Sequence, residues 1–69
     1  MNNGEYLKEM GAKIKALRNA KNLSQKQLAE MCNLDAGSFW RIEVGQKNSH
    51  ILTLKKIADK LEVNVRDFL

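Results

Sequence analysis

The chain of 69 residues contains no proline, a single cysteine and a single histidine. One cysteine and one histidine can form neither a disulfide nor a structural metal site, so neither can stabilise this small core. No run of apolar residues is longer than two, which excludes a membrane-spanning helix and the apolar core of a secretion signal. We therefore predict one cytoplasmic domain, residues 1–69, with no metal, cofactor or membrane partner.

Apolar residues recur every three or four positions, as they do in amphipathic helices. The first such stripe is Leu7, Met10, Ile14 and Leu17, and a later one is Ile51, Leu54, Ile57, Ala58 and Leu61. The first helix is expected to end near Asn22, because Asn tolerates the left-handed conformation that commonly ends helices. Ser49 or His50 is expected to cap the helix that begins near residue 51. With no competing strand pattern, the sequence predicts an all-α domain of five helices.

The residues typical of a helix N-cap and first turn occur three times in the sequence. Ser24 stands three residues before Gln27, which predicts a capping box, and Asp35 begins a similar segment. Asn64 and Asp67 repeat the capping box near the end of the chain. Helices are therefore predicted to begin at residues 24, 35 and 64, and the last of these is the short fifth helix.

The second and third helices are separated only by residues 32–34, so they must cross steeply as in a helix-turn-helix at about 24–44. Ala29 suits the close approach of the two helices, and Asn33 suits a turn residue with positive φ. Phe39 and Ile42 are predicted to face the core. The outward face of the third helix is then Ala36, Gly37, Trp40, Arg41 and Val44.

From Ile14 to Leu69 the chain resembles the lambda-repressor-like (Xre or Cro-type) family of helix-turn-helix DNA-binding domains. The residues that carry the resemblance are Ile14, Leu17, Arg18, Leu23–Gln25, Leu28–Glu30, Leu34, Arg41–Glu43, Gly45, Lys47, Asn48, Thr53, Leu54, Ile57, Ala58, Leu61 and Val63–Leu69. The resemblance implies five helices, with the third in the major groove of double-stranded DNA. It also implies a sequence-specific transcriptional regulator that binds a two-fold operator as a homodimer.

The same resemblance assigns roles to individual residues. Those implied to face the bases are Ala36, Gly37, Trp40 and Arg41. Those implied to contact phosphates are Ser24, Gln25, Ser38, Lys47 and Asn48. Gln25 is also expected to brace a side chain of the recognition helix, and Arg18 is expected to form a structural ion pair with Glu43.

Two of the base-facing residues leave alternatives open. Arg41 can pair with guanine O6 and N7 or contact a phosphate, and Ala36 can offer its methyl to thymine. Trp40 has three interpretations: packing over a thymine methyl or sugar edge, partial burial against the second helix or the following loop, and contact with a protein partner.

The positive charge is concentrated outside the predicted reading helix. The net charge is +4 and the pI about 9.5, yet residues 24–50 carry three basic and three acidic groups, whereas residues 1–23 carry five and two. Many family members have a basic residue or Asn at the position of Val44, Lys or Arg at that of Gln46, and Pro at that of Ser49. We therefore expect only about two or three phosphate neutralisations per subunit.

A homodimer needs an interface, and the candidates are Val63, Val65, Phe68 and Leu69, which could instead form the lid of the monomer's own core. Two copies would bind half-sites about one helical turn apart. The sequence does not choose between a repressor, a restriction-modification controller and an antitoxin that binds a toxin and regulates its own transcription. The rival from another class is a helical protein-interaction module without DNA binding. No catalytic constellation or small-molecule site is evident, so we do not expect an enzyme.

Overall fold

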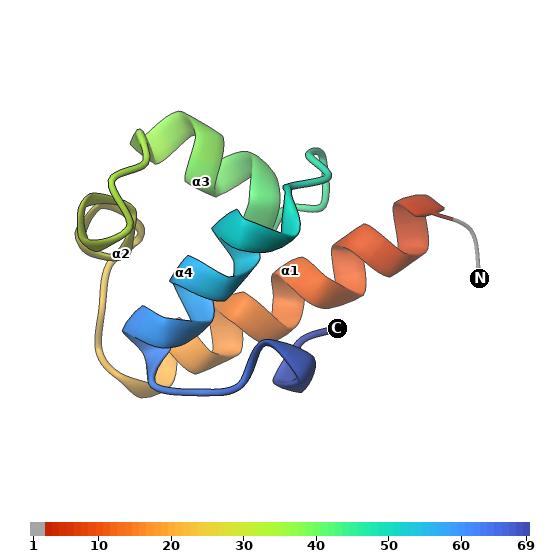
Figure 1. Cartoon of the computed structure of the whole chain (residues 1–69). Coiled ribbons are helices and arrows are strands. Elements are labelled where there is room, and N and C mark those ends of the chain that lie inside the picture. The colour runs from red at the N-terminus through yellow and green to blue at the C-terminus, as the bar shows by residue number, and fades with distance from the viewer. Residues whose placement is uncertain (1–2) are drawn as a thin grey trace.

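The chain folds around a long first helix, α1 (Asn3–Ala20), which runs diagonally behind the other elements in Figure 1. In this computed structural model, which describes residues 3–69, the elements that follow are α2 (Gln25–Met31), α3 (Ala36–Glu43), α4 (Ile51–Leu61) and the 3-10 segment η1 (Val65–Asp67). Residues 3–69 contain no strand, so the all-α class is confirmed. Residues 1 and 2 of the predicted domain lie outside the described residues. No helix within residues 3–69 is long and apolar enough to cross a membrane.

The predicted helix starts are confirmed, and each is held by a local hydrogen bond. Ser24 Oγ accepts from the backbone N–H of Gln27 (3.0 Å), and the Gln27 side chain accepts from the backbone N–H of Ser24 (2.7 Å), which completes the capping box. Asp35 accepts from the N–H of Ser38 at 2.9 Å. His50 caps α4, because its Nδ1 accepts from the N–H of Leu52 at 3.1 Å.

The turns between helices use left-handed residues at the two predicted positions. Asn22 has φ 57° after α1, and Asn33 has φ 58° between α2 and α3. A third such residue, Glu62 (φ 60°), ends α4 and was not predicted. Its carboxylate accepts a hydrogen bond from Lys21 Nζ at 2.8 Å, which links the end of α1 to the end of α4.

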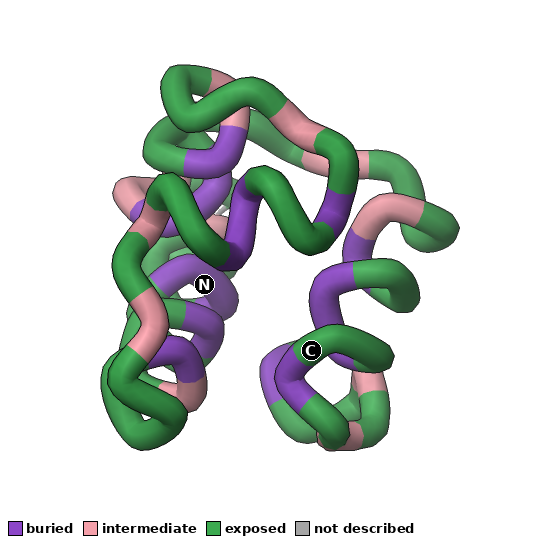
Figure 2. Tube along the Cα trace, turned by 90° about the vertical axis from the view of Figure 1, so that its left-hand side faces the viewer, coloured by how far each residue is buried: buried purple, intermediate pink, exposed green. Residues whose placement is uncertain are grey.

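The core lies between the inner faces of the helices, where the buried segments in Figure 2 turn toward one another. Its buried apolar members are Met10, Ile14, Leu28, Ala29, Cys32, Phe39, Ile42, Leu54, Ile57, Ala58, Leu61 and Phe68. Cys32 is among them, and burial raises the pKa of its thiol above the ordinary value against the opposing effect of Lys56 and Lys60. Cys32 is therefore a packing residue with little thiolate character.

The predicted fifth helix is not an α-helix. Residues after Asn64 form one 3-10 turn, in which the N–H of Asp67 bonds to the carbonyl of Asn64 (2.9 Å) and that of Phe68 to the carbonyl of Val65 (3.2 Å). These bonds join residues three apart, as in a 3-10 turn, and Phe68 leaves the turn with a non-helical φ of −126°. The capping box of Asn64 and Asp67 is nevertheless present, since it needs only a single turn.

Two apolar residues lie elsewhere than the sequence analysis placed them. Phe68, a candidate dimer contact, is 0% exposed and belongs to the core, because η1 turns its ring inward beneath α1 and α4. The interpretation as a lid on the monomer's core is therefore right for this residue. Ile51, assigned to the inner stripe of α4, is half exposed in the first turn of that helix.

Gly11 brings α1 against the end of α3. It is buried, and a Cβ at this position would overlap the carbonyl oxygens of Ile42 and Glu43. Backbone atoms cannot move aside as a flexible side chain can. The two helices can therefore approach this closely only because residue 11 has no side chain.

Gly11→Ala is expected to lower the free energy of unfolding by about 2–3 kcal/mol, because the added methyl must push α1 away from α3. Urea unfolding followed by circular dichroism measures the change. Gly37→Ala is the matched control in an exposed part of α3, where the nearest atom to the new Cβ is Asp35 Oδ2 at 3.3 Å. Alanine's higher helix propensity should leave this variant as stable as the parent chain or more so. Equal stability of both variants would contradict the close approach of α1 and α3.

Candidate nucleic-acid interface

The two helices of the predicted helix-turn-helix are joined by a tightly bonded turn. Leu34 N–H donates to the carbonyl of Ala29 at 2.8 Å, and Asn33 N–H donates to that of Glu30 at 3.1 Å. In Figure 1, α2 is seen nearly end-on while α3 runs across the view, so the helices cross steeply. Ala29 is buried, as the predicted close approach requires. The turn therefore has the geometry of a helix-turn-helix.

The side chains of α3 divide into a buried face and an exposed face. Phe39 and Ile42 are buried in the core, as predicted. The four residues expected to face bases are all exposed: Ala36, Gly37, Trp40 and Arg41. Their spacing places them along one side of the helix, and Val44 at its end is half-buried. Trp40 is 45% exposed and contributes most of the apolar surface on the exposed face of α3.

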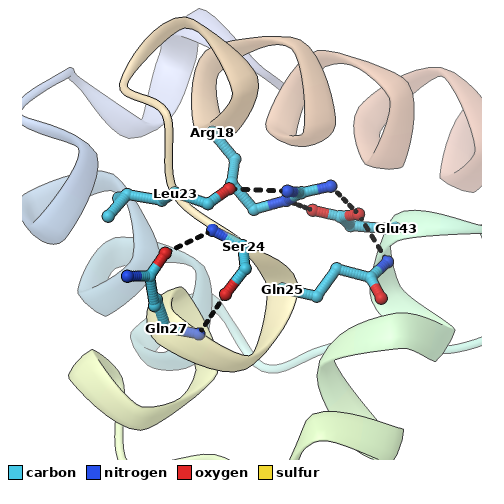
Figure 3. A network of polar contacts seen from close by, with 6 residues as sticks. All are labelled: Arg18, Leu23, Ser24, Gln25, Gln27 and Glu43. Carbon is cyan, nitrogen blue, oxygen red and sulfur yellow. Dashed lines mark hydrogen bonds and ion pairs between the residues drawn. The ribbon is translucent and has the colours of Figure 1, made fainter.

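A buried polar network holds α3 against α1 and α2 (Figure 3). Arg18 of α1 donates through Nε to Glu43 Oε2 at 2.6 Å and through an Nη to Glu43 Oε1 at 3.1 Å. Its other Nη donates to the carbonyl of Leu23 at 2.7 Å. The side chains of Arg18 and Glu43 are only 8% and 1% exposed, so this two-bond pair is shielded from water.

Gln25 completes this network from the first turn of α2. Its Nε2 donates to Glu43 Oε1 at 2.9 Å, so one carboxylate oxygen receives both Arg18 and Gln25. The brace expected of Gln25 is therefore made to Glu43, a partner that the sequence analysis did not name. The sequence signal for this contact was the carboxylate of Glu43, because a buried Glu has more acceptor positions than one Arg can fill and so needs a second donor.

Some of the residues expected to contact phosphates already have their side chains hydrogen-bonded within the protein. Ser24 accepts a hydrogen bond within its capping box, and Ser38 Oγ donates to Asp35 Oδ1 at 2.7 Å. Lys47 and Asn48 are exposed in the loop between α3 and α4. These candidates therefore come from three places on the chain: the start of α2, the start of α3 and the loop that follows it.

The carboxylate of Asp35 is a fixed negative charge at the start of α3. Hydrogen bonds from the hydroxyl and then the backbone N–H of Ser38 lower its pKa below the ordinary 3.8. Lys47 adds a smaller favourable Coulomb interaction. Asp35 is therefore ionised at neutral pH and accepts from Ser38 through both oxygens.

No cluster of three or more metal-binding side chains occurs among the described residues 3–69.

The sequence of residues 14–68 matches the model of the helix-turn-helix family HTH_3. The chain belongs to this helix-turn-helix family. The match covers most of the chain and includes the two crossing helices, the loop after α3 and the terminal segment. The resemblance to lambda-repressor-like domains is thereby confirmed.

Solved structures of regulators have the same fold. The restriction-modification controller protein C.AhdI from Aeromonas hydrophila is 33% identical with a TM-score of 0.88, over 91% of this chain and 96% of that one. The DNA-binding domain of BldD is 30% identical with a TM-score of 0.85, over 100% of this chain and 99% of that one. The regulator ClgR from Corynebacterium glutamicum, at 24% identity and a TM-score of 0.88 over 91% of this chain and 67% of that one, shows the fold alone. A search of curated protein sequences finds no significant match.

Arg18→Ala is expected to lower the free energy of unfolding by about 3–5 kcal/mol, because Glu43 is then buried without its charged partner. Gln25→Ala removes only one hydrogen bond to that carboxylate and should cost about 1.5–3 kcal/mol. Urea unfolding of both variants gives the ranking. Lys21→Ala is the control, since it breaks the exposed contact to Glu62 and should leave the unfolding midpoint unchanged. An Arg18→Ala midpoint no lower than that of Lys21→Ala would show that the buried pair does not hold the helices.

Proposed function

We propose that the chain is a sequence-specific DNA-binding transcriptional regulator that places α3 in the major groove of its operator. The observation that carries the proposal is the exposed face of α3, held outward by the buried Arg18–Glu43 network on a steeply crossing helix pair. Similar proteins support it, because one is a restriction-modification controller and another is named as a DNA-binding domain. Similarity to C.AhdI over nearly its whole length favours a controller-type regulator over an antitoxin.

In this proposal the exposed residues of α3 meet the base edges and the surrounding residues meet the backbone. The base-facing set is Ala36, Gly37, Trp40 and Arg41. The phosphate-contacting set is Ser24, Gln25, Ser38, Lys47 and Asn48. Gln25 would use its second amide hydrogen for the phosphate, since the first is bonded to Glu43. The phosphate contacts fix the register of the helix, and the base contacts select the sequence.

The proposed interface carries little net charge. Residues 24–50 have three basic and three acidic groups, and most of the excess of positive charge lies in residues 1–23, which have five basic and two acidic groups. Two or three phosphate neutralisations per subunit predict a salt dependence with a slope of about −2 to −3 per subunit. Binding would then depend on the fit of α3 more than on a strong electrostatic field.

We further propose that the protein binds as a homodimer through its terminal segment. Phe68 is excluded from the contact by its burial, which leaves Val63 and Val65, both partly exposed, and Leu69, which is 45% exposed. Leu69 borders a groove of about 280 Å³ that Tyr6, Glu9, Met10 and Lys13 also line, so the segment adjoins a mixed apolar and charged surface of α1. A second copy that covers this surface would also stabilise a small core.

Two substitutions separate base reading from backbone contact once an operator has been selected from a random DNA pool. Arg41→Ala should weaken operator binding by about 1–3 kcal/mol and relax the sequence preference at one position. Lys47→Ala should weaken binding equally on operator and random DNA and reduce the salt slope by about 1. Fluorescence anisotropy at several salt concentrations measures both effects. If no motif emerges even at low salt, the exposed Trp40 and the zero net charge of residues 24–50 would favour a protein-interaction module instead.

Size-exclusion chromatography with light scattering tests the dimer. The parent chain should elute as a dimer, and the double variant Val65→Ser, Leu69→Ser should elute as a folded monomer. Leu52→Ser is the matched control, because Leu52 is the most exposed large apolar residue (67%) within residues 3–69 but lies at the other end of α4 from this segment. A monomeric Leu52→Ser together with a dimeric double variant would place the interface at the start of α4 and contradict the proposal.

A further inference from the structure

The N-terminal half of α1 packs directly against the loop that follows α3. Gly45 begins this loop with φ 79°, and a Cβ at its position would lie 2.7 Å from the backbone N, the Cα and the Cγ of Lys8. The backbone and the first part of the side chain of Lys8 are therefore in contact with Gly45. Figure 1 shows the same arrangement, with the loop beside the N-terminal part of α1.

Two lysines of α1 lie on the side of the helix that meets α3. Gly11 marks this side, because it packs against the carbonyls at the end of α3. Residues three and four apart share one side of a helix, which places Lys8 and Lys15 before and after Gly11 along that side. Lys13 points elsewhere, since it lines the groove beside the terminal segment. The lysines of α1 are thus divided between the side next to α3 and the side next to the groove.

The side chain of Lys8 is exposed, and its ammonium is not paired with a carboxylate. Among the described residues, the side chains that form ion pairs with carboxylates are those of Arg18 and Lys21. Lys47, the cation of the loop, follows Gly45 by two residues, a span of at most about 7 Å. One lysine of α1 and one lysine of the loop therefore both originate next to the same glycine.

The proposed DNA interface contains few cations for the backbone. Residues 24–50 hold Lys26, Arg41 and Lys47, and the assignment of Arg41 to a base leaves two of them for phosphates. A third phosphate neutralisation therefore requires a cation from another part of the chain. Lys8 is a cation that packs directly against the loop expected to contact phosphates.

Resting on the proposed DNA-binding function, we propose that the DNA interface extends from α3 and its loop onto α1, where Lys8 neutralises a backbone phosphate next to the one contacted by Lys47. This contact carries no sequence information. It adds a fixed point for the register of α3, because α1 and the loop then hold the DNA backbone together. Part of the positive charge of α1 thereby acts at a defined phosphate.

The salt dependence of operator binding tests this contact. Lys8→Gln removes the charge but keeps the carbon atoms that pack against Gly45. The slope of log affinity against log salt concentration should become less steep by about 0.9, the value of one phosphate contact. Between about 200 and 50 mM salt, the parent chain should then gain about 3.5-fold more affinity than the variant. Lys8→Arg keeps the charge and should keep the slope of the parent chain in fluorescence anisotropy.

Lys13→Gln is the matched control, because it removes the same charge from an exposed lysine of the same helix on the groove side. Its slope should equal that of the parent chain. An equal decrease in Lys13→Gln and Lys8→Gln would show that the charge of α1 acts as a general field and would overturn the contact. The unfolding midpoint and light scattering of each variant check that fold and assembly are retained.

Uncharged phosphates locate the contact on the DNA. The phosphates of the selected operator are replaced one at a time by methylphosphonate, which removes the charge of that phosphate alone. One replacement should weaken binding of the parent chain but not of Lys8→Gln. It should neighbour the phosphate whose replacement weakens binding of the parent chain but not of Lys47→Gln.

The failures of the two proposals are distinguishable. If the random pool yields no motif, the proposed function fails, and the slope on random DNA still measures the Lys8 contact because phosphate contacts do not depend on sequence. If the chain binds no DNA at all, both proposals fail. If the operator is bound but Lys8→Gln keeps the slope of the parent chain, or no methylphosphonate effect depends on Lys8, the interface does not reach α1 and the DNA-reading function stands.

Discussion

The buried pair of Arg18 and Glu43 is the interaction on which the arrangement of the helices depends. It joins the end of α1 to the end of α3, and Gln25 adds the start of α2 to the same carboxylate. Ion pairs removed from water are retained only when their hydrogen-bonding capacity is met, and here both Glu43 oxygens and all three guanidinium nitrogens have partners. The network therefore orients α3 while the apolar core supplies the driving force for folding.

That orientation matters because the domain is small. Helix α3 has eight residues, and its inner face is filled by Phe39 and Ile42, so little side-chain surface remains to fix its angle. Gly11 lets α1 approach the carbonyls at the end of α3, and the polar network prevents rotation there. The exposed face is thus presented on a rigid support, which a reading helix requires because base contacts depend on sub-ångström placement.

The exposed face of α3 is mostly apolar, and Arg41 is its one charged side chain. Most of the net positive charge lies in residues 1–23, whereas residues 24–50 are neutral overall and α3 holds one exposed cation, Arg41. A protein of this kind gains little from nonspecific attraction to the backbone. In the proposed complex, sequence discrimination would come from the few contacts of α3, and a second copy would double those contacts.

Most of the fold could be predicted from the sequence because its signals are local. The caps at Ser24, Asp35 and Asn64 act within four residues, and the left-handed Asn22 and Asn33 follow from the properties of one side chain. The family motif identified the helix-turn-helix and the Arg18–Glu43 pair. The left-handed Glu62 carries no such signal, because it ends α4 and its side chain is bonded to Lys21, which follows the end of α1.

The sequence by itself determined that α1 to α4 are helical, where α2, α3 and α4 begin and which face of α3 is outward. Only the tertiary structure decided that Phe68 is buried, that Ile51 is exposed and that Gln25 binds Glu43. The spacing of apolar residues shows which side of a helix is apolar, but burial depends on whether another element covers that side. Which element covers a helix face depends on contacts between segments far apart in the chain. The contacts among α1, α3 and the terminal turn are seen only in the tertiary structure.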